Sequence, residues 1–295
     1  MMRSFFIVVR RDPLLLVCAG FLALVVALAA LGGTITGYDA NQISSASLQP
    51  PSPAHWFGTD LFGRDLLTRT LEGARISLLI AAAATAISLT VGVTYGMISG
   101  YIGGRVDNLM MRVLEVIYAL PTLILVIVLV ATLEEPATRL LQAIGLRAIQ
   151  PRIVLIFIFV GLTEWLTMAR IIRGQVLVLR EQPFVQAAVA LGRPHRLIIW
   201  RHLLPNLTGI ILVYLTLTIP AAMLDESFLS FLGLGVQAPK ASWGTLVSEA
   251  AQLINPIHSY GWMLLFPGGM MALTLLALNF LGDGLRDALD PRVKK

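Results

Sequence analysis

Five ionisable residues stand within or beside long apolar stretches of the sequence, where charged side chains are unusual. Glu164, Asp225 and Glu226 follow or interrupt apolar runs, and Arg112 and Glu115 are three residues apart in another. An ionisable side chain inside a membrane span is a candidate for lining a transport pathway or relaying protons. Glu164, Glu115 or Asp225 could therefore serve a transporter driven by protons.

The same residues also have structural interpretations. Arg112 and Glu115 share one helical face and are expected to pair near the membrane boundary. Asp225 and Glu226 are expected to end their span among the headgroups, and lining the outer mouth of a pathway is the alternative. Glu164 remains open between a structural role and a role in the pathway.

Catalytic and cofactor chemistry finds little support in the sequence. No convincing Ser or Asp dyad of a membrane-embedded hydrolase is visible in the apolar stretches. No Gly-rich loop ends in Gly-Lys-Ser/Thr, so the chain cannot hold ATP in that manner. The single cysteine, Cys18, can form neither an intrachain disulfide nor a metal cluster. We expect no catalytic, metal or cofactor site in this chain.

The composition is that of an integral membrane protein. The 295 residues are 57% hydrophobic and 13% charged, against about 25% charged in ordinary soluble domains, and the mean hydropathy is +0.80. The formal net charge of +5 could suggest nucleic-acid binding. The basic residues are instead dispersed between apolar spans, as the positive-inside rule requires, so nucleic-acid binding is excluded.

Apolar stretches predict an all-α protein with six transmembrane helices. They cover about 14–31, 76–97, 108–132, 152–172, 206–224 and 262–281. The first stretch is long enough to span the bilayer, and a cleaved signal peptide is the alternative. We expect an N-terminal helix with an outer interfacial segment over 1–75, and a five-helix core over 76–295 that ends in a cytoplasmic tail, 284–295.

Charge asymmetry orients these spans. Arg3, Arg10 and Arg11 precede the first span, and six spans put both termini on one side. This topology assigns 15 of the 22 Lys and Arg residues to the side of the termini and 7 to the other. Because positive charge collects on the cytoplasmic side, both termini are expected in the cytoplasm.

Small residues and prolines predict how the spans pack and bend. Gly92, Gly96 and Gly100 lie at a four-residue spacing, which makes a flat stripe that another helix can approach closely. Pro121 is expected to kink the third span, and Pro220 to interrupt the fifth near its end; both are candidates for lining a pathway. A polar connector with proline at both ends is expected over 134–151.

Two polar segments are expected on the outer side. In the first, Trp56 is suited to the headgroup boundary, and Asp60 is expected to cap a short helix that follows it. The second, 239–260, contains Trp243 and a short helix. Trp56, Asp60, Arg64, Asp65 and Trp243 are the candidates for contact with an external partner.

The loop 173–205 is the long polar interruption of the chain. Six Lys and Arg residues fall between Arg170 and Arg201, a density that a lipid-exposed helix would not carry. Residues 185–191 predict one short helix, which Gly192 ends. Pro194 then starts a second, to about residue 203, and Pro205 is expected to end it and redirect the chain.

The surface of this loop is suited to docking against a protein. Ala187, Ala188 and Ala190 leave a low relief that can lie deep in a groove of a partner. Arg193, Arg196 and Arg201 can steer the loop and pair with acids; Arg193 and Arg196 flank the glycine turn. An amphipathic helix lying on the membrane is the alternative, although it would need neither the glycine break nor so many small residues.

Motifs in the loop and elsewhere carry a resemblance. Gln186, Ala187, Ala188 and Gly192, followed by His202, Leu204 and Pro205, resemble the coupling signature of binding-protein-dependent ABC importer permeases: Glu-Ala-Ala, then Gly, then Leu-Pro. Residues 55–65, 226–235, 242–244 and 279–291 are similar to the second permease subunit of the oligopeptide, dipeptide and nickel family.

This resemblance implies a type I importer permease in the bacterial inner membrane. It implies a second, homologous permease subunit, two cytoplasmic ATPase subunits that carry ATP and Mg²⁺, and a periplasmic or lipid-anchored solute-binding protein. Short peptides are the implied cargo, with nickel, glutathione or another small solute as alternatives. The loop around residues 186–192 would transmit closure of the ATPases to the spans.

The sequence departs from the family pattern at three positions. Gln186 stands where the signature has Glu, so an ionic contact at that position is lost. Glu164 and Asp225 stand where the resemblance implies neutral residues, which leaves their role open, with a part in recognising this protein's own substrate as one interpretation.

Overall fold

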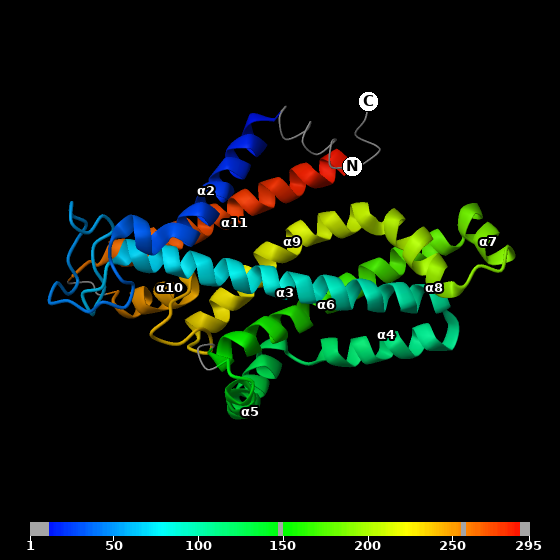
Figure 1. The fold of residues 1–295 in the computed structure, drawn as a ribbon, viewed down its shortest axis with the longest axis horizontal. Coiled ribbons are helices and arrows are strands. Elements are labelled where there is room, and N and C mark those ends of the chain that lie inside the picture. The colour runs from blue at the N-terminus through cyan, green and yellow to red at the C-terminus, as the bar shows by residue number, and fades with distance from the viewer. Residues whose placement is uncertain (1–11, 147–149, 255–257, 290–295) are drawn as a thin grey trace.

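The computed structural model describes residues 12–146, 150–254 and 258–289, and almost all of them are helical (Figure 1). The basic residues Arg3, Arg10 and Arg11 and residues 290–295 of the expected tail lie outside this part of the chain. The spanning helices are longer than the apolar stretches predicted. The elements are α2 (Pro13–Thr36), α3 (Leu66–Ile102), α4 (Gly104–Ala119), α5 (Thr122–Ala143), α6 (Pro151–Arg180), α7 (Pro183–Ala190), α8 (His195–Ile198), the π-helix η1 (Ile199–Leu203), α9 (Leu204–Phe231), α10 (Trp243–Gln252) and α11 (Gly261–Leu289).

Five helical stretches of the described chain are long and apolar enough to cross a membrane. They are α2, α3, α6, the continuous run of α8, η1 and α9, and α11. A sixth span exists only if α4 and α5 count as one broken span. The expected six spans therefore consist of five unbroken helices and one bent pair.

The third predicted span is broken rather than kinked. α4 and α5 meet at an angle of 88°. Leu120 is extended, with ψ of 132°, and Pro121 follows with ψ of 111°. The proline ring disfavours a helical conformation for the residue before it, so two successive residues leave the helix. Pro121 was identified correctly as the bend, but the bend is sharper than expected.

Three other expectations about helix ends were wrong. The connector predicted over 134–151 is helical as far as Ala143, because a single proline inside a helix, here Pro136, costs one hydrogen bond without ending it. Pro220 does not interrupt α9, which continues to Phe231. Asp225 and Glu226 consequently lie inside this helix and do not end it.

The glycine stripe of α3 packs against α6 as expected. A Cβ added at Gly92 would lie 2.7 Å from Met168 Cβ, and one at Gly100 would lie 2.8 Å from the carbonyl oxygen of Arg173. At Gly96 it would collide with the backbone of Ala169. Only hydrogen at these positions allows the two backbones to come so close.

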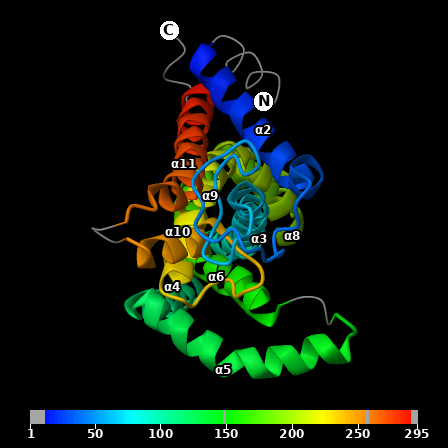
Figure 2. The ribbon, with the colours of Figure 1, turned by 90° about the vertical axis from the view of Figure 1, so that its left-hand side faces the viewer.

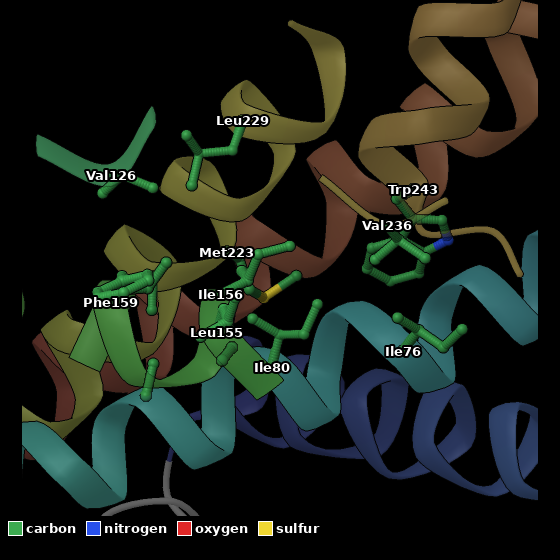
Figure 3. Close-up of a cluster of buried hydrophobic side chains, with 14 of the residues drawn as sticks. Ile76, Ile80, Val126, Leu155, Ile156, Phe159, Met223, Leu229, Val236 and Trp243 are labelled. Carbon is green, nitrogen blue, oxygen red and sulfur yellow. The ribbon is translucent and has the colours of Figure 1, made fainter. Parts of the chain in front are cut away.

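The main apolar core lies where α3, α6 and α9 meet. Figure 3 shows Ile80 of α3, Ile156 of α6 and Met223 of α9 gathered at its centre, and all three are fully buried. Trp243, at the start of α10, closes the cluster at its outer end. This core holds α6 and α9, which carry Glu164 and Asp225, against α3.

The two polar regions lie at opposite ends of the molecule. The segment 37–65 and α10 are at one end of α3, and α7 and α8 are at the other (Figure 1). The start of α2 and the end of α11 lie side by side, away from the segment 37–65. Seen from the end that carries the segment 37–65, α5 lies beneath the other helices, on the side opposite α2 and α11 (Figure 2).

Candidate functional site

The loop 173–205 forms a small helical projection that is firmly seated on the core. α7 begins at Pro183, whose fixed φ suits the first turn of a helix. Gly192 follows with φ of +68°, a left-handed conformation that favours glycine. Val185 and Ala188 of α7 are buried in a second apolar cluster with Val176 of α6. The predicted helix and its glycine stop are confirmed.

The chain leaves this loop differently from the prediction. Pro205 lies in the first turn of α9 and does not redirect the chain, because α8, η1 and α9 form one continuous run. In η1 the amide of Leu204 donates to the carbonyl of Ile199, one residue farther back than in an α-helix. Such a π-turn absorbs an irregularity without ending the helix, here next to a proline that has no N–H to donate.

The outward face of α7 has few polar groups and no cover within the described chain. Gln186, Ala187 and Ala190 are exposed, and so are Val189 and Leu191, at 48% and 78% of their surface. Ala188 was expected on this face and is instead buried against the core. The low relief comes from Ala187 and Ala190, and two apolar side chains stand beside them.

The polar residues of the loop surround this face. Arg193 and Arg196 are exposed on the turn and at the start of α8. His202 is half-buried in η1, where its carbonyl accepts a hydrogen bond of 2.6 Å from Asn206 Nδ2. Leu204 is half-buried and Pro205 is exposed. The arginines, and not His202, are therefore free to meet an acidic partner.

The loop also contacts the C-terminal end of α3. The hydroxyl of Tyr101 lies 2.8 Å from Nδ1 of His195 in α8. Arg180 at the end of α6 donates to the carbonyl of Gly100, at 3.2 Å. A groove of about 800 Å³ separates α3 from α7 and α8 beside these contacts. Displacement of the loop would therefore act directly on α3, which runs over 37 residues.

A cavity of about 520 Å³ brings two of the predicted pathway residues together. Glu164 of α6 and Asp225 of α9 both line it, with Tyr118 of α4 and the hydroxyls of Thr163 and Thr167. Neither carboxylate forms an ion pair within the described part of the chain. The cavity can accommodate a small polar or cationic group.

The remaining predicted pathway residues lie elsewhere. Pro121 and Pro220 do not line this cavity, and Pro220 is buried inside α9. Glu226 is fully buried and accepts hydrogen bonds from Ser77 of α3, at 3.0 Å, and from Ser230, at 2.6 Å. Glu226 is therefore a link between helices and cannot face a pathway in this conformation.

The expected ion pair of Arg112 with Glu115 does not form. Both side chains line a second cavity, of about 480 Å³, between α4 and α6. Within the described residues neither takes part in an ion pair, whereas Arg173 of α6 pairs with Asp107 of α4 at 2.5 Å. The pairing that holds α4 to α6 thus runs between helices and not along one helix.

Most of the outer contact candidates are buried in an ionic network. Asp60 accepts hydrogen bonds from Arg64 Nε, at 2.6 Å, and from Arg69 Nη1, at 2.5 Å. Arg69 also pairs with Glu249 of α10, at 2.8 Å. The exposed fractions of Asp60 and Arg69 are 1% each. This network fastens the segment 37–65 and α10 to the start of α3.

Asp65, and not Asp60, caps α3. Its carboxylate accepts from the amide of Thr68, at 2.8 Å, and also pairs with His55. Trp243 is buried and donates from Nε1 to the carbonyl of Thr70, at 3.0 Å. The helix expected around Trp243 is confirmed as α10. Of the five contact candidates, only Trp56, at 67%, exposes a large surface to a partner.

Sequence reasoning missed the partners that hold these residues. Arg69, Glu249 and Ser77 were not singled out, although each forms a buried or partly buried contact between segments far apart in the chain. Arg69 and Glu249 are 180 positions apart, and a pairing of that kind leaves no local spacing signal. The described residues contain no group of three or more His, Cys, Asp or Glu that could hold a metal ion.

Comparisons with known proteins agree on one family. Residues 92–295 match the model of a family described as "Binding-protein-dependent transport system inner membrane component". The chain is 41% identical over 287 residues to the oligopeptide transport system permease protein OppC of Bacillus subtilis, a match that covers 97% of this chain and 88% of that protein. It is 44% identical to OppC of Escherichia coli K12, over 92% of this chain and 83% of that protein.

A dipeptide permease and a solved structure extend this result. The dipeptide transport system permease protein DppC of Bacillus subtilis is 44% identical over 83% of this chain and 71% of its own length. A chain from inward-facing conformations of the MetNI methionine ABC transporter matches with a TM-score of 0.56 and 17% identity. That match covers 76% of this chain and 96% of the other, and it supports the fold.

Proposed function

Because the chain belongs to the family of binding-protein-dependent transport system inner membrane components, we propose that it forms half of the channel of an ATP-driven importer for short peptides. The names of its relatives, oligopeptide and dipeptide permeases, support this cargo. Nickel, glutathione or another small solute carried by the same machinery is the alternative.

The observation that carries this proposal is the exposed face of α7. Leu191 and Val189 are apolar and largely exposed, yet Val185 and Ala188 anchor the same helix in the core. A rigid projection with an uncovered apolar face is suited to seating in a groove of another protein. We propose that this groove belongs to one of two cytoplasmic ATPase subunits, which hold ATP and Mg²⁺.

The contacts of the loop support a route for the coupling. Closure of the ATPases would press on α7, and Tyr101 with His195 and Arg180 with Gly100 would transfer the displacement to α3. α3 runs without a break over 37 residues to the outer network at Arg69. Movement at one end of such a helix is transmitted to the other, because packed helices shift as rigid bodies.

The remaining partners follow from other surfaces. Val106, Leu109, Val113 and Val116 of α4 are exposed apolar residues, suited to lipid or to a second, homologous permease. The outer segment around Trp56, held by the network of Asp60 and Arg69, is suited to an external solute-binding protein. In this arrangement both termini lie in the cytoplasm, and the chain itself is not an enzyme.

We propose that the cavity of Glu164 and Asp225 is part of the translocation pathway. It lies between α6 and α9, beside the break of α4 and α5, where irregular backbone allows helices to separate. Its two carboxylates also favour a second candidate function, proton-coupled secondary transport. A proton-coupled transporter requires no ATPase partner, so the presence or absence of ATPase subunits in the native complex distinguishes the two functions.

Purification of the tagged chain in mild detergent tests the proposal. The expected result is co-purification of a second permease and an ABC ATPase in stoichiometric amounts, and of a binding protein with a bound peptide. Leu191→Arg is expected to lose the ATPases while it keeps the second permease. Ile254→Arg is the control, because Ile254 is equally exposed, at 70%, but lies next to α10 at the opposite end. A wild-type chain that purifies without an ATPase would overturn the proposal.

A further inference from the structure

The second cavity, between α4 and α6, has no role in the mechanism above. Its volume is about 480 Å³, within the range of small-ligand sites, and three arginines line it: Arg112, Arg170 and Arg173. Asn108 and Glu115 contribute the other polar groups. Three guanidinium groups around one cavity give it a basic lining, which is suited to an anion.

One of the three arginines is already neutralised. Arg173 donates from Nε and Nη2 to the two carboxylate oxygens of Asp107, both at 2.5 Å. The hydroxyl of Ser99 on α3 also donates to Asp107, at 2.5 Å. This bidentate pair forms a fixed wall of the cavity and joins α3, α4 and α6.

The other two arginines retain free donors. Neither Arg112 nor Arg170 forms an ion pair or a side-chain hydrogen bond with any described residue. Arg170 is positioned by an aromatic contact, with its guanidinium carbon 4.7 Å from the centre of the Tyr118 ring. Glu115 offsets one of the two charges, so the residues that line the cavity retain one net positive charge.

We infer that Arg112 and Arg170 form a subsite for a carboxylate. This inference rests on the proposed function and names its ligand: the C-terminal carboxylate of the transported peptide. Guanidinium groups match the planar geometry of a carboxylate and can bind it through two parallel hydrogen bonds.

The neighbouring cavity supports a peptide as the source of this carboxylate. Tyr118 lines the cavity of Glu164 and Asp225 and contacts Arg170 of the basic cavity, so the two lie next to each other. Glu164 and Arg170 are six positions apart on α6, which is about 9 Å along the helix. An extended tripeptide spans about 10 Å. A peptide is positive at its N-terminus and negative at its C-terminus, so opposite charges in the two cavities favour one orientation.

Uptake by the complete complex in vesicles, with saturating binding protein, tests this subsite. A tripeptide with a free C-terminus is compared with the same tripeptide amidated at its C-terminus. The measured quantity is the ratio of the two uptake rates in each variant, relative to wild type. Because every variant uses the same binding protein, the preference of that protein cancels in this comparison.

Arg112→Gln and Arg170→Gln are each expected to reduce this ratio about tenfold, the effect of one lost charge-assisted hydrogen bond. Arg112→Lys keeps the positive charge but loses the two parallel donors of the guanidinium group, and it is expected to reduce the uptake ratio less. It also serves as the informative variant if Arg112→Gln does not assemble. Arg139→Gln is the matched control, because Arg139 is exposed on α5 and pairs only with Glu135 within the described chain; its ratio should equal that of wild type.

Two results would overturn the subsite and leave the proposed function intact. One is an equal reduction for both tripeptides in the Arg112 and Arg170 variants. The other is a reduction for both tripeptides that occurs only in vesicles containing phosphatidylglycerol and not in phosphatidylcholine alone, which would assign the cavity to a lipid phosphate. A wild-type complex that takes up neither tripeptide would contradict the proposed function itself.

Discussion

The carboxyl group of Glu226, buried inside α9, accepts a hydrogen bond of 3.0 Å from the hydroxyl of Ser77 on α3. Ser77 in turn accepts from the backbone amide of Trp243, at 3.2 Å, so one carboxyl group joins α3, α9 and the start of α10. Gly244 of α10 packs so closely on α9 that an added Cβ would lie 2.6 Å from Ser227 Cα. The short helix α10 is therefore part of the packed core and not a loose loop.

Replacing Glu226 with alanine is expected to destabilise the protein. The hydroxyls of Ser77 and Ser230 would lose their partner in a buried site, at a cost of about 2 kcal/mol. The thermal unfolding midpoint of the detergent-purified protein should fall. Glu135→Ala is the control, since Glu135 is 77% exposed. Equal midpoints for the two variants would show that Glu226 does not hold these helices together.

Gly96→Ala is expected to separate α3 from α6. The new methyl group would collide with the backbone of Ala169 and lie 2.9 Å from Ile172 Cβ, and overpacking of this kind costs about 1 to 3 kcal/mol. Gly20→Ala adds the same methyl group to α2, where nothing lies within 4 Å. Thermal unfolding of both variants in detergent measures the difference. A Gly96 variant as stable as the Gly20 variant would contradict the close packing.

Gly192→Val is expected to uncouple transport from ATP hydrolysis while the chain still inserts and assembles. A Cβ at Gly192 meets no atom within 4 Å, so the effect arises from the backbone, which at φ of +68° strains a β-branched residue by about 1 to 2 kcal/mol. Gly192→Asn is the control, because asparagine tolerates this conformation. Peptide uptake per ATP hydrolysed should fall for valine only, and a normal ratio in both variants would remove the coupling role.

Glu164→Gln is expected to change which peptides are carried. Glu164 lines the cavity with Asp225, so loss of its charge should reduce uptake of basic peptides relative to acidic ones. A panel of peptides of equal length measures this preference, with Glu135→Gln as a control on the exposed surface of α5. Unchanged uptake across the panel would assign Glu164 to structure.

Local features of the chain were predictable from sequence because their causes are local. The stop of α7 at Gly192 and the packing stripe at Gly96 each depend on a single residue type at a particular position, whereas the start of α7 at Pro183 lies two residues before the predicted one. Proline fixes a helical φ, and glycine is favoured in a left-handed turn and where two backbones touch.

Long-range contacts explain where the predictions were wrong. Asp225 and Glu226 were interpreted as the end of a span, since two adjacent acids are costly in a membrane. Ser77, 149 positions away from Glu226, removes that cost for one of them. Asp60 and Asp65 are both residues that can cap a helix, but α3 begins only after Asp65. The Asp60 carboxylate instead accepts from the amides of Phe62 and Arg64 in the preceding turn and pairs with Arg69.

Peptide uptake into vesicles tests the central claim most directly. The purified chain would be reconstituted with its permease partner, its ATPases and its binding protein, and labelled peptide would be supplied outside. In some vesicles the ATPases face the lumen, and we predict that these take up peptide only when the lumen contains ATP. Uptake should stop in an ATPase variant that cannot hydrolyse ATP and should continue in the presence of an uncoupler. Uptake that persists without the ATPases and collapses with the uncoupler would contradict the account.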